Sequence, residues 1–142
     1  MAVPHPRPII GGGGIGDEFP TLESAAELLS TLKVLDVKRI DTAALYLLTN
    51  IGASETYLGE LGAADQGFTL NTKPLALGLE ANGTLSPEAI EKSLATSYER
   101  LKLKGHKVDV YTLHVPNYTT PLKDQAANAT CWSQHGISRD KW

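Results

Sequence analysis

The sequence predicts an α/β fold built on a parallel β-sheet. Short apolar segments begin near residues 7, 37, 68 and 108, and each is followed by residues that favour a helix. A strand followed by a helix, repeated along the chain, is typical of parallel sheets with right-handed crossovers. With 142 residues, of which 42% are hydrophobic, the chain is large enough for one domain with a hydrophobic core, over residues 1–142.

The first two strands and helices follow from local patterns. Arg7–Ile10 is a short apolar run that ends in glycines, and Thr21 begins a helical pattern. Val37–Ala43 is the second strand candidate, and a helix is expected from about Ser54 to Leu61. The first helix should bury one face, which carries Leu22, Ala25, Ala26, Leu29 and Leu32.

The third strand and helix have the clearest boundaries. Phe68–Thr72 is predicted to be a strand, and Ser86–Glu88 to start a helix. The Ser86 side chain can accept a hydrogen bond from the first-turn amides, and proline at the first helical position loses no internal hydrogen bond. Gly105 is expected to end this helix.

The fourth strand and helix are less regular. Val108–His114 is a nearly continuous apolar run, and we expect a strand buried on both faces. A fourth helix can begin within Leu122–Ala129. Residues 129–142 have no clear period and are predicted to form an irregular tail.

Composition excludes several classes of protein. The net charge of −3 is not concentrated into a basic stripe, which argues against a nucleic-acid partner. No stretch approaches the roughly 20 apolar residues of a membrane span, and the first residues do not resemble a signal peptide. Cys131 is the only cysteine, so no intramolecular disulfide or Cys-based zinc site can form within one chain, and no metal is expected. We expect a cytoplasmic protein with no membrane partner.

The glycine run is a weak signal for a nucleotide-binding loop. Gly11, Gly13 and Gly16 have the spacing of a dinucleotide-binding loop, but any glycine run produces it. A Rossmann loop leads directly into a helix whose N-terminus meets the pyrophosphate. Here Asp17–Pro20 lie before Thr21, so the sequence does not favour a Rossmann fold.

Four polar residues lie where the strand pattern ends or, for Tyr46, just beyond it, and they are more informative: Asp41, Tyr46, Lys73 and His114. In a parallel α/β fold the carboxyl ends of the strands share one rim, so these side chains should converge on one cleft. A tyrosine hydroxyl is a weak acid unless a nearby cation stabilises the phenolate. Lys73 can supply that cation, Asp41 can hold Lys73, and His114 can orient a carbonyl, so the group can protonate a carbonyl oxygen as hydride reaches its carbon.

Each of the four residues also has a structural interpretation. Asp41 can cap a local turn, Lys73 can be a solvated strand end, and Tyr46 can be a core aromatic with a wet hydroxyl. A lone histidine at a strand end is more often structural than catalytic. The joint occurrence of four matching residue types favours the catalytic interpretation.

From about residue 8 to residue 128 the sequence resembles the aldo-keto reductases, most closely the branch that reduces aflatoxin-type dialdehydes and related aldehydes. The motifs that carry the resemblance are Arg39–Tyr46 (RIDTAALY), Ser54-Glu55, Leu58-Gly59, Thr72-Lys73, Ser93–Leu101, Tyr111–Pro116 (YTLHVP) and Thr119–Pro121.

The resemblance implies a (β/α)8 TIM barrel, NADPH as hydride donor and a small-molecule carbonyl substrate. In the family's mechanism Tyr46 would be the general acid, Lys73 would make it a stronger acid, Asp41 would pair with Lys73, and His114 would orient the carbonyl. Asp41 is also the residue expected to contact the cofactor.

The sequence departs from the family pattern in three ways. Leu47–Ile51 stand where the family usually turns at glycine, so the loop that carries Tyr46 is expected to be displaced, and Asn117 replaces an aspartate. A barrel of this kind needs about 250 residues or more. We therefore expect a truncated barrel of about four βα units that contains little of the cofactor site. Its open strand edges could be paired in a homodimer.

Three functions remain open from the sequence. The first is an NADPH-dependent aldo-keto reductase that reduces an aldehyde or ketone. The second is a cofactor-independent isomerase, dehydratase or cyclase that uses the same acid-base residues. The third is an inactive, truncated relative that acts as a binding protein.

Overall fold

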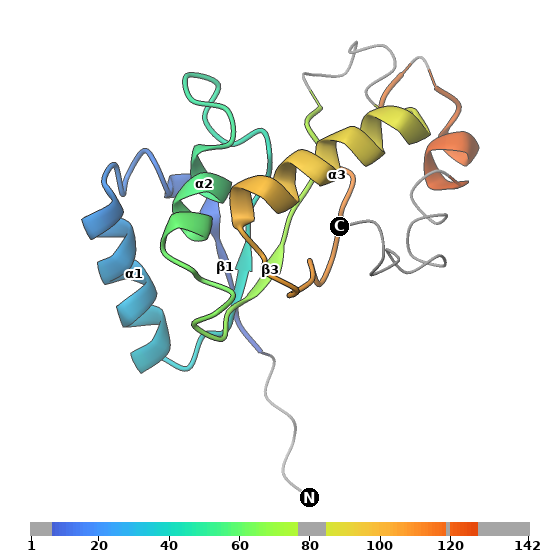
Figure 1. The fold of residues 1–142 in the computed structure, drawn as a ribbon. Coiled ribbons are helices and arrows are strands. Elements are labelled where there is room, and N and C mark those ends of the chain that lie inside the picture. The colour runs from blue at the N-terminus through green and yellow to red at the C-terminus, as the bar shows by residue number, and fades with distance from the viewer. Residues whose placement is uncertain (1–6, 77–84, 119, 128–142) are drawn as a thin grey trace, which may run out of the picture.

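A computed structural model describes residues 7–76, 85–118 and 120–127. Its centre is a parallel sheet of three short strands, β1 (Ile9–Gly11), β2 (Arg39–Asp41) and β3 (Thr69–Asn71), in the order β1-β2-β3 (Figure 1). The register pairs Ile10 with Ile40, and Ile40 with Leu70. The prediction of a parallel α/β fold is confirmed, although the strands are shorter than the apolar runs that predicted them.

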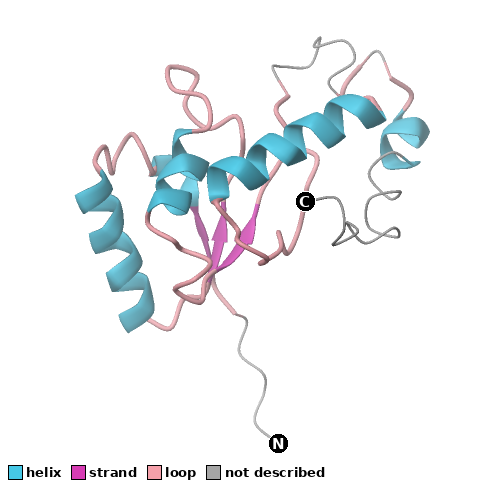
Figure 2. Cartoon of the chain, viewed as in Figure 1, coloured by secondary structure: helices cyan, strands magenta, loops and turns pink. Residues whose placement is uncertain are grey.

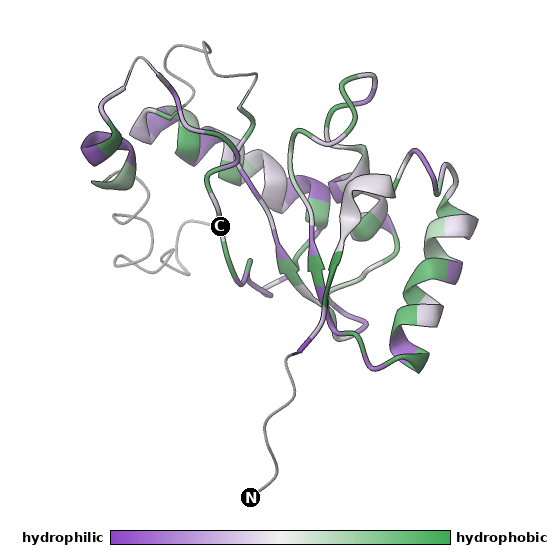
Figure 3. Ribbon diagram, turned by 180° about the vertical axis from the view of Figure 1, so that it is seen from behind, coloured by the Kyte–Doolittle hydropathy of each residue, from purple (hydrophilic) through white to green (hydrophobic). Residues whose placement is uncertain are grey.

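Three helices follow the strands: α1 (Leu22–Val34), α2 (Ala53–Glu60) and α3 (Pro87–Leu101). Helices α2 and α3 lie on one face of the sheet, and α1 lies beside the strands (Figures 2 and 3). Thr21 caps α1 in a reciprocal capping box with Ser24, and Ser86 caps α3, as the sequence predicted.

The glycine run forms a single turn of 3-10 helix, η1 (Gly12–Gly14), directly after β1. Helix α1 begins eight residues after that turn, at Leu22. The run therefore does not open a helix as a Rossmann loop would, in agreement with the sequence.

The hydrophobic core lies between the sheet and its helices. Apolar residues of β2, β3, α1, α2 and α3 form one buried cluster. Its most buried members, each at most 2% exposed, are Ile15, Ala25, Leu29, Ile40, Leu58, Ala63, Leu70 and Leu101. Burial of this face fixes the strands relative to the helices, and thereby the positions of the strand ends.

Two expectations about α3 and the fourth strand are wrong. Helix α3 ends at Leu101 rather than near Gly105, because Lys102 adopts a left-handed conformation (φ 47°) that stops the helix. Val108–His114 is not a strand buried on both faces. It forms an isolated parallel bridge between Tyr111 and Thr72, and Val110 is 44% exposed, because no described element pairs with its outer side.

The last described residues, 122–127, are helical, which confirms the start of the fourth helix. The predicted irregular tail at 129–142, with Cys131, lies outside the described residues. In the described part of the chain, no helix has the length and apolar character needed to cross a bilayer.

A sequential parallel order with helices on one face is the arrangement of an arc of a barrel, whereas a doubly wound fold has helices on both faces. The described residues supply three paired strands and a fourth position beside β3. The complete barrel implied by the resemblance stays a prediction.

Candidate active site

The four residues singled out in the sequence come together at the carboxyl end of the sheet. Asp41 is the last residue of β2, and Tyr46 lies in the loop that follows. Lys73 lies two residues after β3, and His114 follows the bridge at Tyr111. The strand order brings these positions to one rim, as predicted.

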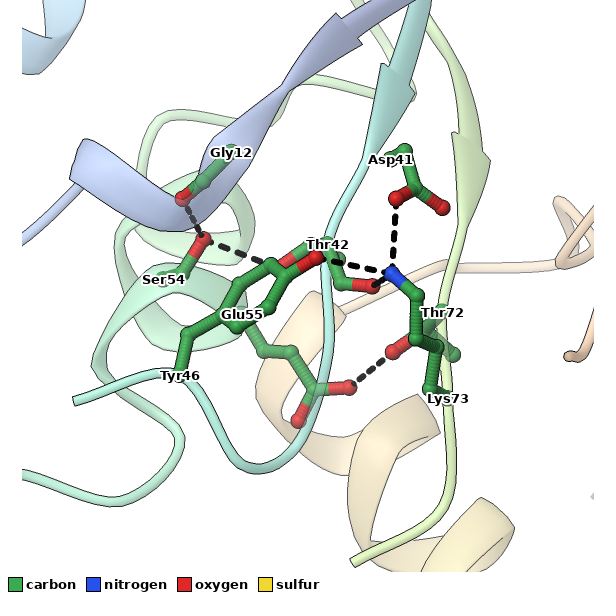
Figure 4. A network of polar contacts seen from close by, with 8 residues as sticks. All are labelled: Gly12, Asp41, Thr42, Tyr46, Ser54, Glu55, Thr72 and Lys73. Atoms are coloured by element: carbon green, nitrogen blue, oxygen red, sulfur yellow. Dashed lines mark hydrogen bonds and ion pairs between the residues drawn. The ribbon is translucent and has the colours of Figure 1, made fainter. Parts of the chain in front are cut away.

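Lys73 is the centre of the site (Figure 4). Its ammonium nitrogen Nζ donates to Asp41 Oδ2 at 2.6 Å, to Tyr46 Oη at 2.8 Å and to the Thr42 carbonyl oxygen at 2.9 Å. An ammonium group has three N–H donors, so these three acceptors use all of them. The Lys73 side chain is only 13% exposed, which strengthens its interactions with the carboxylate and the phenol.

The Tyr46 hydroxyl has one hydrogen-bond partner among the described residues. Its oxygen accepts from Lys73, and its own proton donates to no group among the described residues. Lys73 Nζ also lies 4.9 Å from the centroid of the Tyr46 ring. The His114 ring meets the same ring edge-on, with centroids 5.7 Å apart and an interplanar angle of 84°. Tyr46 is thus fixed between a cation and an imidazole.

His114 has an unsatisfied nitrogen at the site. Its Nδ1 is buried and has no hydrogen-bond partner within the described part of the chain. Burial and the Lys73 cation lower the pKa of His114, while Asp41 opposes the shift. The imidazole is therefore neutral at neutral pH, and a neutral imidazole can donate a hydrogen bond to a carbonyl oxygen.

The loop that carries Tyr46 is not displaced from Lys73, contrary to the expectation from its sequence. Leu47, the first residue of the stretch that departs from the family pattern, adopts a positive φ of 63°. This is the left-handed conformation that glycine adopts without strain. The backbone therefore turns after Tyr46 despite the side chain, and Tyr46 Oη stays within 2.8 Å of Lys73.

The structure adds supporting residues whose role the sequence did not indicate. Ser54 Oγ donates to the carbonyl oxygen of Gly12 at 2.9 Å and lies 2.8 Å from Thr42 Oγ1 (Figure 4). Both side chains are fully buried. Ser54 therefore joins η1, α2 and the end of β2 behind the site.

Glu55 is the other supporting residue. Its carboxylate is fully buried, accepts from Thr72 Oγ1 at 2.6 Å and pairs with Arg100 of α3 at 3.2 Å. In the sequence a glutamate in the first turn of a helix looks like a solvated residue, so only its place in the family motif marked it out.

The residues at this rim fit the reacting end of a nicotinamide cofactor. The Asp41 side chain is 33% exposed, so its carboxylate can accept hydrogen bonds from a ligand beside Lys73. The unsatisfied His114 Nδ1 offers a further polar contact. The same residues do not fit the negatively charged phosphates of that cofactor. Lys73 is the one lysine or arginine in the sequence segments 12–20, 42–52, 72–86 and 112–121.

Comparisons with known proteins identify the family of the chain. The aldo/keto reductase family model matches residues 9–139. Human aldo-keto reductase family 7 member A3 is 31% identical over 124 residues, which cover 84% of this chain and 35% of that protein. Oxidoreductase sirO of Leptosphaeria maculans is 35% identical over 108 residues, covering 73% and 29%, respectively. The chain spans about a third of the length of the curated relatives it matches.

Solved structures show the same fold. The aldo-keto reductase AKR11C1 from Bacillus halodurans superposes with a TM-score of 0.70 at 22% identity, over 92% of this chain and 43% of that one. The thermostable aldo-keto reductase Tm1743 gives a TM-score of 0.68 at 24% identity, over 91% and 46%. With the match of the family model over most of its length, the chain belongs to the aldo/keto reductase family.

Proposed function

We propose that the chain takes part in the NADPH-dependent reduction of an aldehyde or ketone, with Tyr46 as the general acid. The observation that carries the proposal is the geometry of Lys73, which links the Asp41 carboxylate to the Tyr46 hydroxyl, while no described residue accepts the Tyr46 proton. When bound, the nicotinamide supplies the hydride to the carbonyl carbon. Among the matched relatives, human aflatoxin B1 aldehyde reductase member 4 is named for an aldehyde, which supports this class of substrate.

The side chains of the site have separate tasks in this proposal. Tyr46 Oη gives its proton to the carbonyl oxygen, and the Lys73 ammonium at 2.8 Å stabilises the negative charge left on the phenol oxygen. Asp41 holds Lys73 in place at 2.6 Å. Neutral His114, in edge contact with the Tyr46 ring, donates to the carbonyl oxygen and so orients it.

Cofactor binding by this chain is expected to be weak. Asp41 and His114 would hold the reacting end of the cofactor, whereas residues 12–20, 42–52, 72–86 and 112–121 contain no lysine or arginine besides Lys73 that could pair with its phosphates. The outer sides of β1 and of the bridge at Tyr111 are also unpaired by described residues, and a second copy could pair them. Sedimentation with and without NADPH measures assembly and cofactor binding together.

The test of the proposal is NADPH oxidation by the purified full chain in the presence of small aldehydes and ketones. Tyr46→Phe should lower the rate by about 10²- to 10⁴-fold, because it removes the proton donor and keeps the ring. Tyr118→Phe is the matched control, since Tyr118 is 71% exposed and has no hydrogen bond to Asp41, Tyr46, Lys73 or His114 among the described contacts, and it should keep the full rate.

Two results would contradict this function. A folded chain that neither binds nor oxidises NADPH at millimolar concentration would exclude the reductase activity. Turnover of a carbonyl compound in the absence of NADPH, lost in Tyr46→Phe, would instead assign the same residues to cofactor-independent acid-base chemistry.

A further inference from the structure

Two adjacent residues in the first turn of α2 contact both of the strand ends that form the site. Ser54 Oγ lies 2.8 Å from the hydroxyl of Thr42, and Thr42 directly follows Asp41. Glu55 Oε1 accepts from the hydroxyl of Thr72 at 2.6 Å, and Thr72 directly precedes Lys73. Figure 4 shows both contacts in the neighbourhood of the Lys73 ammonium.

These contacts are made in the interior of the molecule. Thr42, Ser54, Glu55 and Thr72 are all fully buried. A buried carboxylate is costly unless it is hydrogen-bonded and paired, and Glu55 meets that cost with Thr72 on one oxygen and Arg100 on the other. Apolar residues would fill this space without a desolvation cost. The polar contacts therefore indicate that the ends of β2 and β3 must be held in defined positions, beyond what stability alone requires.

Thr72 connects Lys73, which directly follows it, to the segment that carries His114. Its backbone N–H donates to the Val110 carbonyl oxygen at 3.1 Å, and its own carbonyl oxygen accepts from the Thr112 N–H at 3.1 Å. A displacement of Thr72 would therefore move Lys73, and also the segment that ends in His114. Thr42 has a similar role on the other side, because its carbonyl oxygen accepts from Lys73 Nζ.

We propose that Ser54 and Glu55 are positioning residues that set the separation of Asp41 and Lys73, and with it the contact of Lys73 with Tyr46. Neither side chain is placed to touch a substrate, because both are fully buried. Ser54 acts through Thr42, and Glu55 acts through Thr72. The proposal rests on the proposed function in one respect: the contact of Lys73 with Tyr46 matters for activity only if Tyr46 is the general acid. The geometric claim, that Glu55 holds Lys73 on its three acceptors, can be measured without any turnover.

The experiment measures the rate at which an amine-reactive reagent, trinitrobenzenesulfonate, modifies Lys73 in the full chain, by mass spectrometry of the Lys73 peptide. Exposed Lys92 in the same sample is the internal standard. In Thr72→Val and in Glu55→Gln we expect several-fold faster modification, because Lys73 leaves its acceptors. Thr72→Ser, which keeps the hydroxyl, should restore the slow rate.

Two further variants serve as the positive and the negative control of the measurement. Asp41→Asn loosens Lys73 directly and should give fast modification. Thr31→Val removes a threonine hydroxyl that donates to Glu27 within α1, at 2.9 Å, and should leave the rate unchanged. If Thr72→Val does not fold, as judged by circular dichroism, Ser54→Ala carries the same test through Thr42.

The results separate this inference from the proposed function. If Lys73 is modified at the wild-type rate in folded Thr72→Val and Glu55→Gln, the positioning role is wrong, whatever the activity. If the wild type has no reductase activity, the proposed function fails, and the modification rates still decide the positioning role. Where activity is present, Thr72→Val should lower kcat several-fold with little change in KM, and Thr72→Ser should restore it.

Discussion

The candidate site draws its residues from two regions that differ in packing. The strand-end region, residues 39–46, 53–60 and 69–73, supplies Asp41, Tyr46 and Lys73 and is built on paired strands and a buried helix turn. The His114 segment, residues 108–117, supplies His114 through one isolated bridge. Asp41, Tyr46 and Lys73 thus lie at or close to the ends of paired strands, whereas His114 follows a single isolated bridge.

The His114 segment is attached by a small set of bonds. Backbone hydrogen bonds join Asp109 to Leu70 and Thr112 to Thr72, and Asp109 pairs with Arg39 of β2 at 2.6 Å. Beyond His114, the Asn117 backbone is bonded to the Gln125 side chain. Regions with few buried contacts open at low free energy. We therefore expect the His114 segment to exchange its amide hydrogens faster than the strand-end region.

The largest expected effect is a loss of unfolding free energy, and it tests whether the strand-end region is packed more tightly than the His114 segment. Leu70→Ala, in β3 and 1% exposed, should lower the free energy of unfolding by about 3 kcal/mol, because it leaves a cavity in the core. Val110→Ala, at a position that is 44% exposed, should cost less than about 1 kcal/mol. Denaturant unfolding of both variants measures the difference, and equal losses would show that the two regions are packed alike.

A smaller effect tests how the His114 segment is attached. Asp109→Asn removes the ion pair with Arg39, whose side chains are 34% and 39% exposed, so the loss of global stability should be under about 1 kcal/mol. Hydrogen exchange at the Asp109 and Thr112 amides should nevertheless become faster. Amides of β2 should exchange as in the wild type. A uniform acceleration over the sheet would mean that the ion pair stabilises the whole fold instead.

The smallest effect is the pH dependence contributed by His114. Because burial and Lys73 lower the pKa of His114 in the folded protein, the unfolded chain binds more protons just below the ordinary histidine pKa of about 6.5. The contribution of neutral His114 to the free energy of unfolding is therefore complete above about pH 6.5, and it is lost as the pH falls through the lowered pKa. The thermal midpoint of the wild type should fall more steeply between about pH 7 and about pH 5 than that of His114→Asn. Parallel curves would contradict the lowered pKa.

The sequence predicted the order of elements and the four candidate residues because both depend on local patterns. Apolar runs marked the strands, and Thr21 and Ser86 marked the starts of α1 and α3. In a parallel sheet the strand ends share one rim, so residue types at those ends could be grouped without knowledge of packing. Their distances to Lys73 could not be obtained in this way.

Other features depend on contacts between distant segments and could not be predicted. Glu55 is buried only because Thr72 and Arg100, remote in sequence, meet its carboxylate. The apolar pattern of Val108–His114 indicated burial, but its exposure depends on which element lies beside it. The positive φ of Leu47 likewise follows from the need to return the chain after Tyr46, which composition does not reveal.

The close approach of Arg100 to α2 has a consequence for how the sequence can change over time. A Cβ atom at Gly52, where φ is +81°, would lie 2.5 Å from the Arg100 guanidinium, so a larger residue there requires the Arg100 side chain to move. That movement would weaken the ionic pairing of the buried Glu55 carboxylate. The effect of a substitution at position 52 should therefore depend on the residue at position 100, and libraries that vary positions 52, 55 and 100 at once should recover combinations that single substitutions miss.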